Sequence, residues 1–590
     1  MHHWIVILSL SLAYAAGSVN GAHACTSLLV TKGASADGSV MITYTADSAG
    51  FCPRLKVLPA IRYPDGAVID VPATKDRPAG KIKQVSRTYH VIGVEWDAEP
   101  DAHGGFWTHQ GIINEFQVAI TETTFGGRSE LVNPQGLINY PMLITFALQR
   151  AKTAREAIDV MVKLIEEYGY NDEGESLSIA DKEEAWVFEI VGTGKQETQP
   201  QFGLPLEASV QAIWVAKKVP DGEISVHANQ ARIGEIPDMP DRDHCFYSNN
   251  IRSFAIEKGW YDPNSGKPFR FDETYDEITV KSKRVCASRV WSIFRRVAPS
   301  QDFSPDYHRG KPDAEPYPWS IKPDKKLSVA DVMALMRDHF EGTEFDMTKG
   351  IDAGPYGLPL RWRPLYWKLE GDDDTEYTWE RPISTQQTGF SMVSQSRTHL
   401  PDMVGGVCWY GVDDSYLTCY FPLYCCITEV PNPFATGSIK EFSWDSAWWV
   451  FNLVSNYANL KFNRIAPEIV KVQQELERET LEWSSMLERA TVESEKIEYL
   501  MLQKEIVPLE EIKALENYRT PQQFLTACSV KMGEKVYKRW QRLAIEIFTK
   551  FNDGYIRGAK GMYPKEGDPY PDEWLHRVLK ERPEQFKLPK

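Results

Sequence analysis

The feature that most constrains this chain is its amino-terminal junction, where an apolar run ends just before "ACTSLLVTKGASADGSVMITYTADS". The apolar run extends from Trp4 to Ala16 and is followed by Ala22-His23-Ala24, the pattern of a cleaved secretion signal. An uncleaved membrane anchor is the alternative, but the run is shorter than the roughly 20 residues that span a bilayer. We therefore expect removal of residues 1–24, which makes Cys25 the first residue of an exported, periplasmic or secreted chain that is not held in a membrane.

Two strand patterns follow Cys25 directly. The segments "TSLLVTK" and "SVMITYT" flank the turn-rich "GASADG", in which Gly33, Asp37 and Gly38 supply turn chemistry. A hairpin centred on this turn pairs residues whose numbers sum to about 71, which places the start of the first strand opposite residues 46–47. Asp47 is then expected beside Cys25; the alternative is that Asp47 only caps a loop.

The remainder predicts an α+β chain with a helical end. Further paired strands are expected at "SLSIAD" with "EAWVFEI", and at "AIWVAKKV" with "EISVHAN" across Pro220-Asp221-Gly222. Capping boxes at Thr153–Glu156 and Ser328–Asp331 open helices that end at Gly169 and near Gly342, and residues 345–385 are typical of a long loop. We expect a catalytic domain over 25–440 and a mainly helical region over 441–590. That region either packs on the body or serves as a lid or a surface for homo-oligomerisation.

Charge and cysteine content limit the partners. The net charge of −16 makes nucleic acid and anionic lipid poor partners. If Cys25 is set apart, eight of the nine cysteines remain. Cys408 and Cys419 lie at equal distances from a predicted turn at 411–415, where they either form a cross-strand disulfide or stay reduced and buried.

Cys25 is the strongest candidate for chemistry. Metal-binding H-E-x-x-H and C-x-x-C, G-x-S-x-G and phosphate-binding motifs are all absent from the sequence, and we expect neither metal nor cofactor. A free thiol has a pKa of about 8.5 and an α-amino group a pKa of about 7.7–8.0. If cleavage exposes Cys25, its amine can therefore accept the proton of its own thiol, and nucleophile and general base belong to one residue.

The start of the mature chain resembles that of the cysteine dipeptidases, a family of N-terminal nucleophile (Ntn) hydrolases distantly similar to bile-salt hydrolases and penicillin V acylases. The resemblance continues through "HQGIINEFQVAITETTFGGR", "YGYNDEGESLSIAD", "EISVHANQARIGE", "SRVWSIFRR" and "STQQTGF", and covers residues 25 to about 460. It implies a four-layer αββα sandwich with the catalytic thiol at a strand end.

The resemblance also assigns residues. Cys25 matches the nucleophile, Asp47 the carboxylate that follows it, Asn229 an oxyanion-hole asparagine and Arg289 an arginine near the thiol. Glu122 and Thr123 fall near substrate-pocket positions, where Glu122 could meet a substrate ammonium or simply be an exposed strand-end residue. The distant relatives have an arginine at the position of Tyr44.

The predicted activity is that of an exported dipeptidase that acts on short peptides through a thioester on Cys25. One alternative keeps the fold and changes the substrate to N-acyl amides. The other is a lipoprotein acylated at Cys25, although Ala22 is a poor match to the leucine that usually stands three places before such a cysteine.

Overall fold

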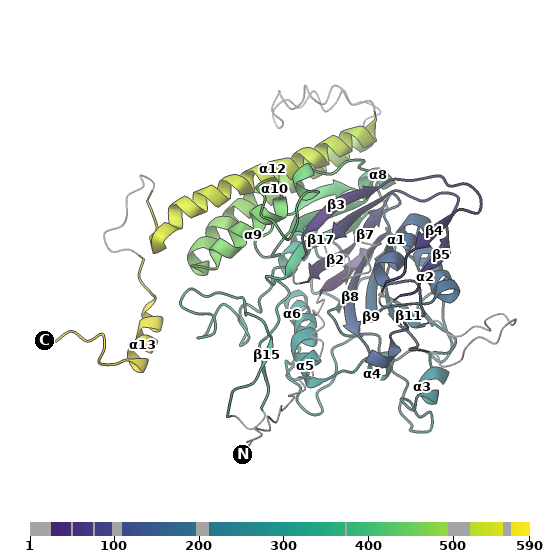
Figure 1. Cartoon of the computed structure of the whole chain (residues 1–590), viewed down its shortest axis with the longest axis horizontal. Helices are drawn as coiled ribbons and strands as arrows, with labels where there is room; N and C mark the ends of the chain where they lie inside the picture. Colours follow the sequence, from purple (N-terminus) through teal and green to yellow (C-terminus); the bar gives the residue numbers. More distant parts are fainter. Residues whose placement is uncertain are drawn as a thin grey trace, which may run out of the picture.

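The computed structural model describes residues 25–48, 51–74, 77–96, 109–195, 212–371, 375–493, 520–558 and 568–589 (Figure 1). The predicted signal, residues 1–24, lies outside the described residues. Two large antiparallel sheets form the body, so the chain is α+β as predicted.

The first sheet has the strand order β14-β12-β1-β2-β17-β18-β19. Its strands are β1 (Ser27–Val30), β2 (Val40–Asp47), β12 (Ile224–His227), β14 (Ser320–Ile321), β17 (Thr388–Ser396), β18 (Val407–Val412) and β19 (Phe421–Tyr424). We call it the seven-stranded sheet.

The second sheet has the order β13-β11-β10-β9-β8-β7-β6-β3 and is called the eight-stranded sheet. Its strands are β3 (Pro53–Leu58), β6 (Val91–Trp96), β7 (His109–Asn114), β8 (Ala119–Gly126), β9 (Gly174–Ala180), β10 (Ala185–Val191), β11 (Ile213–Lys218) and β13 (Cys245–Tyr247). Two small hairpins stand apart from both sheets: β4 (Val68–Val71) with β5 (Gly80–Lys83), and β15 (Tyr366–Trp367) with β16 (Tyr377–Thr378).

The two sheets pack against each other, with β2 of the first on β8 and β9 of the second. Polar bonds cross this interface: the hydroxyls of Ser27 and Thr121 are 3.3 Å apart, and the His227 ring lies between Thr123 and Ser178. Burial lowers the pKa of His227 to about 3, so this ring is neutral and serves as a hydrogen-bonded core residue.

Helices lie against both sheets. Helix α1 (Tyr140–Arg150) contacts β7 and β8, and α2 (Ala154–Tyr168) contacts β9 and β10. On the seven-stranded sheet, α6 (Ser288–Val297) contacts β12, α7 (Val329–Leu335) contacts β17 and α9 (Ala447–Ala458) contacts β18. Strands β9 and β10 are buried along their whole length, because helices cover one face and the other sheet the opposite face.

Shorter helical segments connect these elements. They are α3 (Ser253–Glu257), α4 (Phe271–Tyr275), α5 (Val280–Ser282), α8 (Asp402–Gly405), and the single turns η1 (Lys32–Ala34), η2 (Ser129–Leu131), η4 (Asn432–Phe434) and η6 (Asn552–Gly554). A π-helical turn, η3 (Lys283–Ala287), runs directly into α6.

The β1–β2 hairpin has the predicted register. Leu29 pairs with Ile42, and the pairing extends to a bridge between Thr26 and Thr45. Because every such pair of numbers sums to 71, the end of β2 lies beside the amino end of β1. The register brings Asp47, at the end of β2, toward Cys25, as predicted, and the negative charge of Asp47 raises the pKa of the Cys25 thiol.

The predicted hairpin across residues 220–222 is wrong. Strand β11 pairs with β10 and β13 in the eight-stranded sheet, whereas β12 pairs with β1 and β14 in the other sheet. The turn is tied to the end of β1: Gly222 N donates to Thr31 Oγ1 at 2.9 Å, and that hydroxyl donates to Glu223 O at 2.7 Å. These hydrogen bonds hold the turn at the point where the chain crosses from the eight-stranded sheet to the seven-stranded sheet.

The cross-strand disulfide is also not formed. Cys408 on β18 pairs with Leu423 on β19, while Cys419 lies in the connection before β19. The turn between these strands is longer than the predicted 411–415, which breaks the expected symmetry. Both Cys408 and Cys419 are buried thiols outside any disulfide, so the reduced alternative holds for this pair.

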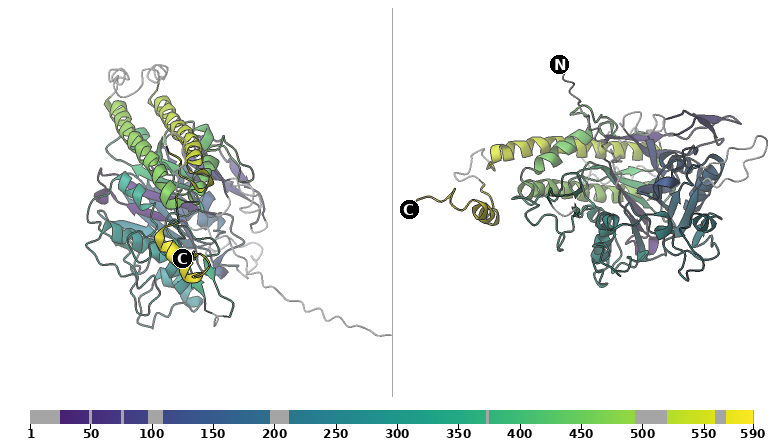
Figure 2. Two further views of the ribbon diagram at one scale, coloured as in Figure 1. Left: turned by 90° about the vertical axis from the view of Figure 1, so that its left-hand side faces the viewer. Right: turned by 60° about the horizontal axis from the view of Figure 1, so that its bottom comes forward.

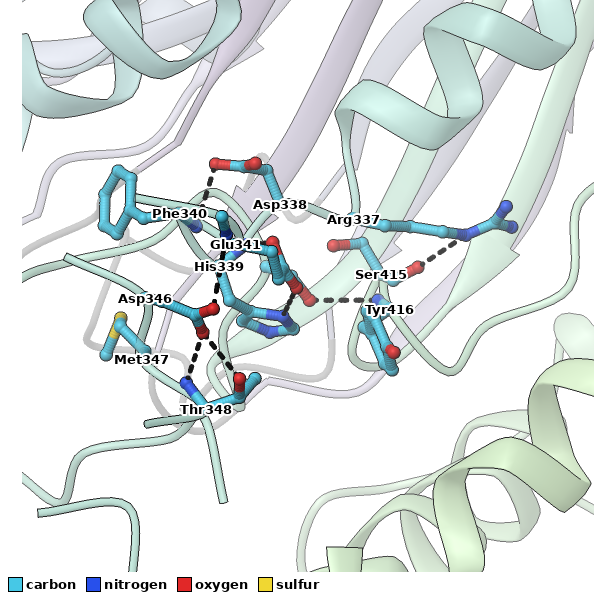
Figure 3. Close-up of polar contacts among 12 residues, drawn as sticks. Arg337, Asp338, His339, Phe340, Glu341, Asp346, Met347, Thr348, Ser415 and Tyr416 are labelled. Atoms are coloured by element: carbon cyan, nitrogen blue, oxygen red, sulfur yellow. Dashed lines mark hydrogen bonds and ion pairs between the residues drawn. The ribbon is translucent and has the colours of Figure 1, made fainter. Parts of the chain in front are cut away.

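The helix starts are predicted better than their ends. Thr153 and Ser328 cap α2 and α7, and Gly169 follows α2 with φ 72°. However, α7 ends at Leu335, well before Gly342. Phe340 has φ 64°, a left-handed conformation that a helix excludes, and its N–H donates to the Asp338 carboxylate (Figure 3). Figure 3 shows how Glu341, Asp346 and Ser415 satisfy neighbouring polar groups of this turn.

The helical end packs on the body. Helix α10 (Phe462–Glu493) and α12 (Pro521–Phe551) run side by side with α9 along the β19 edge (Figures 1 and 2). The Trp540 ring of α12 stacks on Phe451 of α9 at 4.6 Å, and Arg397 after β17 forms a bidentate ion pair with Glu488 of α10. These contacts support the packing interpretation. A last helix, α13 (Asp572–Glu581), has no buried residue.

Within the described residues, no helix combines the length and the apolar character that crossing a membrane requires.

Candidate active site

Cys25 lies immediately before β1 and is 2% exposed. Its Sγ donates to Glu122 Oε1 at 3.4 Å and lies 3.7 Å from the hydroxyl of Tyr44, which itself donates to Glu122 Oε1. Burial raises the pKa of the Cys25 thiol well above its ordinary value, and the negative charges of Glu122 and Asp47 raise it further. The thiol is therefore protonated, and a base has to remove its proton before it can act as a nucleophile.

Tyr44 occupies the position for which the sequence resemblance implies an arginine. It lies on β2 and packs edge-on against Phe390 of β17 with ring centroids 5.3 Å apart. Its hydroxyl sits between the thiol and Glu122, and burial raises the pKa of Tyr44 well above its usual value. The side chain at this position therefore supplies a neutral donor to Glu122 instead of a positive charge.

Asp47 ends β2 and is held through both carboxylate oxygens. Arg381 donates to Oδ2 at 3.0 Å and Thr388 donates to Oδ1 at 2.7 Å. Burial raises the pKa of Asp47 to about 6 against the opposing effect of Arg381, so the carboxylate is mainly ionised at pH 7. The backbone N–H of Asp47 also donates to the Cys25 side chain.

Arg289 ties the start of β1 to the end of β12. Its Nη1 donates to Cys25 O at 2.8 Å and to Thr26 Oγ1 at 2.9 Å, while its Nη2 donates to Ala228 O and Asn229 Oδ1, both at 3.1 Å. Its Nε donates to Val285 O within the π-helical turn. Burial lowers the pKa of Arg289 to about 10, which still leaves it charged at pH 7. The guanidinium thus fixes the backbone that carries the thiol.

Asn229 follows β12 in a left-handed conformation, with φ 56°. Its Nδ2 donates to Thr124 O at 2.7 Å, and its Oδ1 accepts from Arg289. Arg289 thereby links Asn229 to the carbonyl of Cys25. The assignment of Asn229 to an oxyanion hole stays a prediction. The thiol of a second cysteine, Cys286, donates to Asn229 O at 3.1 Å.

The two predicted pocket residues differ in their surroundings. Glu122 on β8 is 1% exposed and touches the thiol, so the strand-end alternative, an exposed glutamate, is wrong. The Thr123 hydroxyl is bonded to Nδ1 of His227 at 2.7 Å, within the interface between the sheets. The structure therefore brings Glu122, but not the hydroxyl of Thr123, to Cys25.

Further carboxyl groups lie near Glu122. Glu175 on β9 is hydrogen-bonded to the Glu122 side chain and accepts from Thr124 Oγ1 at 2.7 Å, and Asp172 precedes β9. Burial raises the pKa of Glu122 and of Glu175, and raises that of Asp172 to about 7. Among the residues that the structure describes, no group of three or more His, Cys, Asp or Glu side chains is arranged to hold a metal ion.

Residues 24–475 match the peptidase family C69, a match that begins one residue before Cys25 and ends within α10. The chain belongs to peptidase family C69. This membership confirms the resemblance to cysteine peptidases of the Ntn type that the sequence motifs indicate.

Three relatives of this C69 chain carry dipeptidase names. A "Probable dipeptidase" of Latilactobacillus sakei is 28% identical over 401 residues, which is 66% of this chain and 71% of the relative. A "Probable dipeptidase" of Salmonella dublin is 26% identical over 406 residues, or 68% and 81% of the two chains. "Probable dipeptidase B" of Streptococcus pyogenes serotype M1 is 24% identical over 559 residues, or 92% and 95%.

Three residues at the centre of this C69 site were missed by sequence reasoning: Glu175, Arg381 and Thr388. Glu175 lies in the motif "YGYNDEGESLSIAD", directly before the predicted strand "SLSIAD", and Thr388 lies in the motif "STQQTGF", so motif position could have singled them out. Arg381 lies in the predicted long loop and is 334 residues from Asp47. Nothing in local periodicity could have paired it with that carboxylate.

Proposed function

We propose that the chain is an exported cysteine dipeptidase that acts through Cys25 after removal of residues 1–24. The observation that carries the proposal is the buried thiol of Cys25 near the start of β1. Arg289 holds the backbone of this residue by donating to the Cys25 carbonyl oxygen at 2.8 Å. The C69 match and the dipeptidase names of the relatives support the reaction class. With this function we propose the four-layer αββα arrangement of Ntn hydrolases for the two sheets and their helices, and a boundary near residue 440 between catalytic and helical regions.

In the proposed mechanism, the α-amine of Cys25 takes the thiol proton. The Sγ then attacks the peptide carbonyl carbon, and the oxyanion is stabilised by Asn229 and by backbone N–H groups. The protonated amine passes its proton to the leaving amine as the C–N bond breaks, which leaves a thioester on Cys25. Water, deprotonated by the same amine, hydrolyses the thioester and regenerates the thiol.

The surroundings of Cys25 support the need for this activation. Because the thiol pKa is raised by burial and by two carboxylates, the thiolate is scarce unless a base is adjacent. Asp47, fixed by Arg381 and Thr388, is suited to hold a newly formed ammonium at the start of β1. Because Arg289 donates to both Cys25 O and Asn229 Oδ1, it fixes the position of Asn229 relative to the Cys25 backbone.

The proposal is tested on the mature, secreted protein. Intact-mass analysis is expected to give a free Cys25 terminus, and alanyl-alanine is expected to be cleaved by that form but not by Cys25→Ala. A terminus at another position, or a diacylglyceryl mass on Cys25, would contradict the proposal. Cleavage of N-acyl amino acids in preference to free dipeptides would instead favour an acylase.

A further inference from the structure

Glu122 and Glu175 form a buried carboxyl pair directly beside the thiol. Glu122 Oε1 lies 3.4 Å from Cys25 Sγ, and the two glutamate side chains are hydrogen-bonded to each other. Both residues are at most 1% exposed. We call these two residues the carboxyl pair.

The carboxyl pair is short of hydrogen-bond donors. Glu122 Oε1 accepts from Tyr44 and Cys25, and Glu175 Oε1 accepts from Thr124. Apart from the hydrogen bond between the two glutamates themselves, Oε2 of each has no donor among the residues that the structure describes. Another buried carboxylate of the eight-stranded sheet, Glu189, has a hydrogen-bond donor for each of its oxygens. Glu189 on β10 accepts from Arg232 N at 2.6 Å, Ile233 N at 3.1 Å and Ser176 Oγ at 3.1 Å.

The carboxyl pair also has no cationic partner. Within the described part of the chain, no ion pair joins Glu122, Glu175 or Asp172 to a lysine or arginine. The titratable and charged groups around the pair are Cys25 before β1, Tyr44 from β2, Tyr140 from α1, and Tyr170 and Asp172 from the segment before β9. Arg77 acts on Asp172 through its charge alone. Ionisation of both adjacent buried carboxyls would place two negative charges side by side away from water, at a high cost in free energy. One proton is therefore shared between them in the unliganded site.

Resting on the proposed dipeptidase function, we propose that the carboxyl pair receives the α-ammonium group of the substrate, whose N–H donors replace the shared proton. That proton leaves to solvent, and no covalent bond changes. The pair then selects substrates with a free amino terminus over their N-acyl counterparts.

Covalent geometry supports this assignment. A substrate α-nitrogen is two bonds from its carbonyl carbon, about 2.5 Å away. The nucleophile attacks that carbon from roughly 3–3.5 Å. A carboxyl group that itself contacts Cys25 Sγ is therefore within reach of the α-ammonium of the first substrate residue. A longer peptide placed with an internal bond at the thiol would bring a neutral amide to the same carboxyls and leave them unpaired.

The α-amine of Cys25 itself is the competing cation for the carboxyl pair. It is covalently close to Sγ in every turnover, whichever substrate is bound. Loss of the pair would then slow charged and N-acylated substrates equally, whereas recognition of the substrate ammonium predicts a loss confined to the free-amine substrate. The comparison of two substrates separates the cases.

The experiment measures kcat/KM of the mature full chain on alanyl-alanine and on N-acetylalanyl-alanine. Glu122→Gln and Glu175→Gln are expected to lower the ratio of these two values at least roughly tenfold, through KM for the free dipeptide. Glu189→Gln is the matched control, because it neutralises a buried carboxyl of the same sheet and should leave the ratio unchanged. In the wild type, KM for alanyl-alanine should fall as pH rises and the shared proton becomes easier to release.

A ratio unchanged in both glutamine variants, or an equal loss on both substrates, overturns the inference while dipeptide cleavage keeps the proposed function. Preference of the wild type for the N-acetyl substrate overturns the proposed function itself. If the variants fail to fold, calorimetry on Cys25→Ala at pH 6.5 replaces them. Binding of alanyl-alanine should release protons to the buffer and binding of N-acetylalanyl-alanine should not; equal release contradicts the inference.

Discussion

Two groups of buried charged residues flank Cys25, and they differ in how completely their polar atoms are satisfied. In the first group, Arg289 places its donors on five acceptors, and both oxygens of Asp47 accept hydrogen bonds. In the carboxyl pair, Glu122 and Glu175 each keep an oxygen to which no other residue in the described part of the chain donates. We call the first group the arginine side.

This difference indicates separate roles for the two groups, one in positioning the thiol and one in binding the substrate. A buried group whose polar atoms are all hydrogen-bonded to the protein mainly fixes the geometry of its neighbours. An incompletely bonded one costs stability until a ligand supplies the missing donors. The arginine side is therefore expected to position Cys25, and the carboxyl pair to meet the substrate. The predictions below test this division.

The largest effect is expected from removing the thiol that both sides serve. Cys25→Ala should lower kcat/KM for alanyl-alanine by a factor on the order of 10⁴ or more, because the nucleophile is lost. Cys528→Ala is the matched control: it deletes another buried thiol, on α12, and should keep wild-type activity. Steady-state kinetics and far-UV circular dichroism on both variants check this, and substantial activity in Cys25→Ala would rule out the thioester route.

The sequence predicts the β1 side of this site better than the rest. The hairpin register follows from turn chemistry and alternation over a short span, so the approach of Asp47 to Cys25 could be foreseen. The partners that complete the arginine side, Arg381 and Thr388, come from more than 330 residues further along the chain. Their placement depends on sheet pairing between β2 and β17, which local patterns do not specify.

The same limit explains the wrong strand pairing at 220–222. Pro220-Asp221-Gly222 is good turn chemistry, but such chemistry does not determine which sheet the next strand joins. Strand β12 pairs with β1, nearly two hundred residues earlier, and Thr31 after β1 is hydrogen-bonded to the turn. Glu175 was missed for a related reason. Its proximity to Glu122 depends on the β8–β9 register, which the motif that contains Glu175 does not specify.

The second prediction tests the arginine side. Arg289→Lys keeps the charge but cannot reach all five acceptors, so kcat/KM should fall roughly 10²–10³-fold as the Cys25 backbone and Asn229 lose their fixed relation. The free energy of unfolding should fall by about 3 kcal/mol, since buried carbonyls lose their donors. Urea denaturation and kinetics measure the two effects.

Arg232 provides the matched control for Arg289. It is also buried and donates to backbone carbonyls, among them Val226 O and Tyr317 O. Arg232→Lys should cost similar stability while the folded fraction keeps its kcat/KM. Equal loss of activity in both lysine variants would mean that Arg289 acts only through general stability.

A third prediction concerns pH. If Asp47 holds the α-ammonium of Cys25, its ionised form raises the pKa of that amine, and activity rises with pH as the amine becomes neutral. Asp47→Asn removes the negative charge, so the ascending limb of kcat/KM should move toward lower pH by roughly 1 unit. The maximal rate should also fall, because the amine is less well positioned. A lower rate with no shift of the limb would assign Asp47 a structural role only.

The smallest effect is expected at Tyr44, the link between thiol and carboxyl pair. Tyr44→Phe removes one donor from Glu122 Oε1 but keeps the ring packed on Phe390. Because this hydrogen bond lowers the pKa of Glu122, its loss makes the carboxyl harder to ionise, and free dipeptides should bind more weakly. One such bond is worth about 0.5–1.5 kcal/mol, so KM for alanyl-alanine should rise roughly two- to tenfold.

The substrate comparison again decides what Tyr44 does. KM for N-acetylalanyl-alanine should hardly change in Tyr44→Phe, since that substrate brings no ammonium to Glu122. If kcat falls on both substrates instead, the hydroxyl acts on the thiol 3.7 Å away and belongs functionally with the arginine side. The division of the site into the arginine side and the carboxyl pair would then change. Tyr44 would position the nucleophile, and Glu122 would bind the substrate ammonium with the help of Glu175 alone.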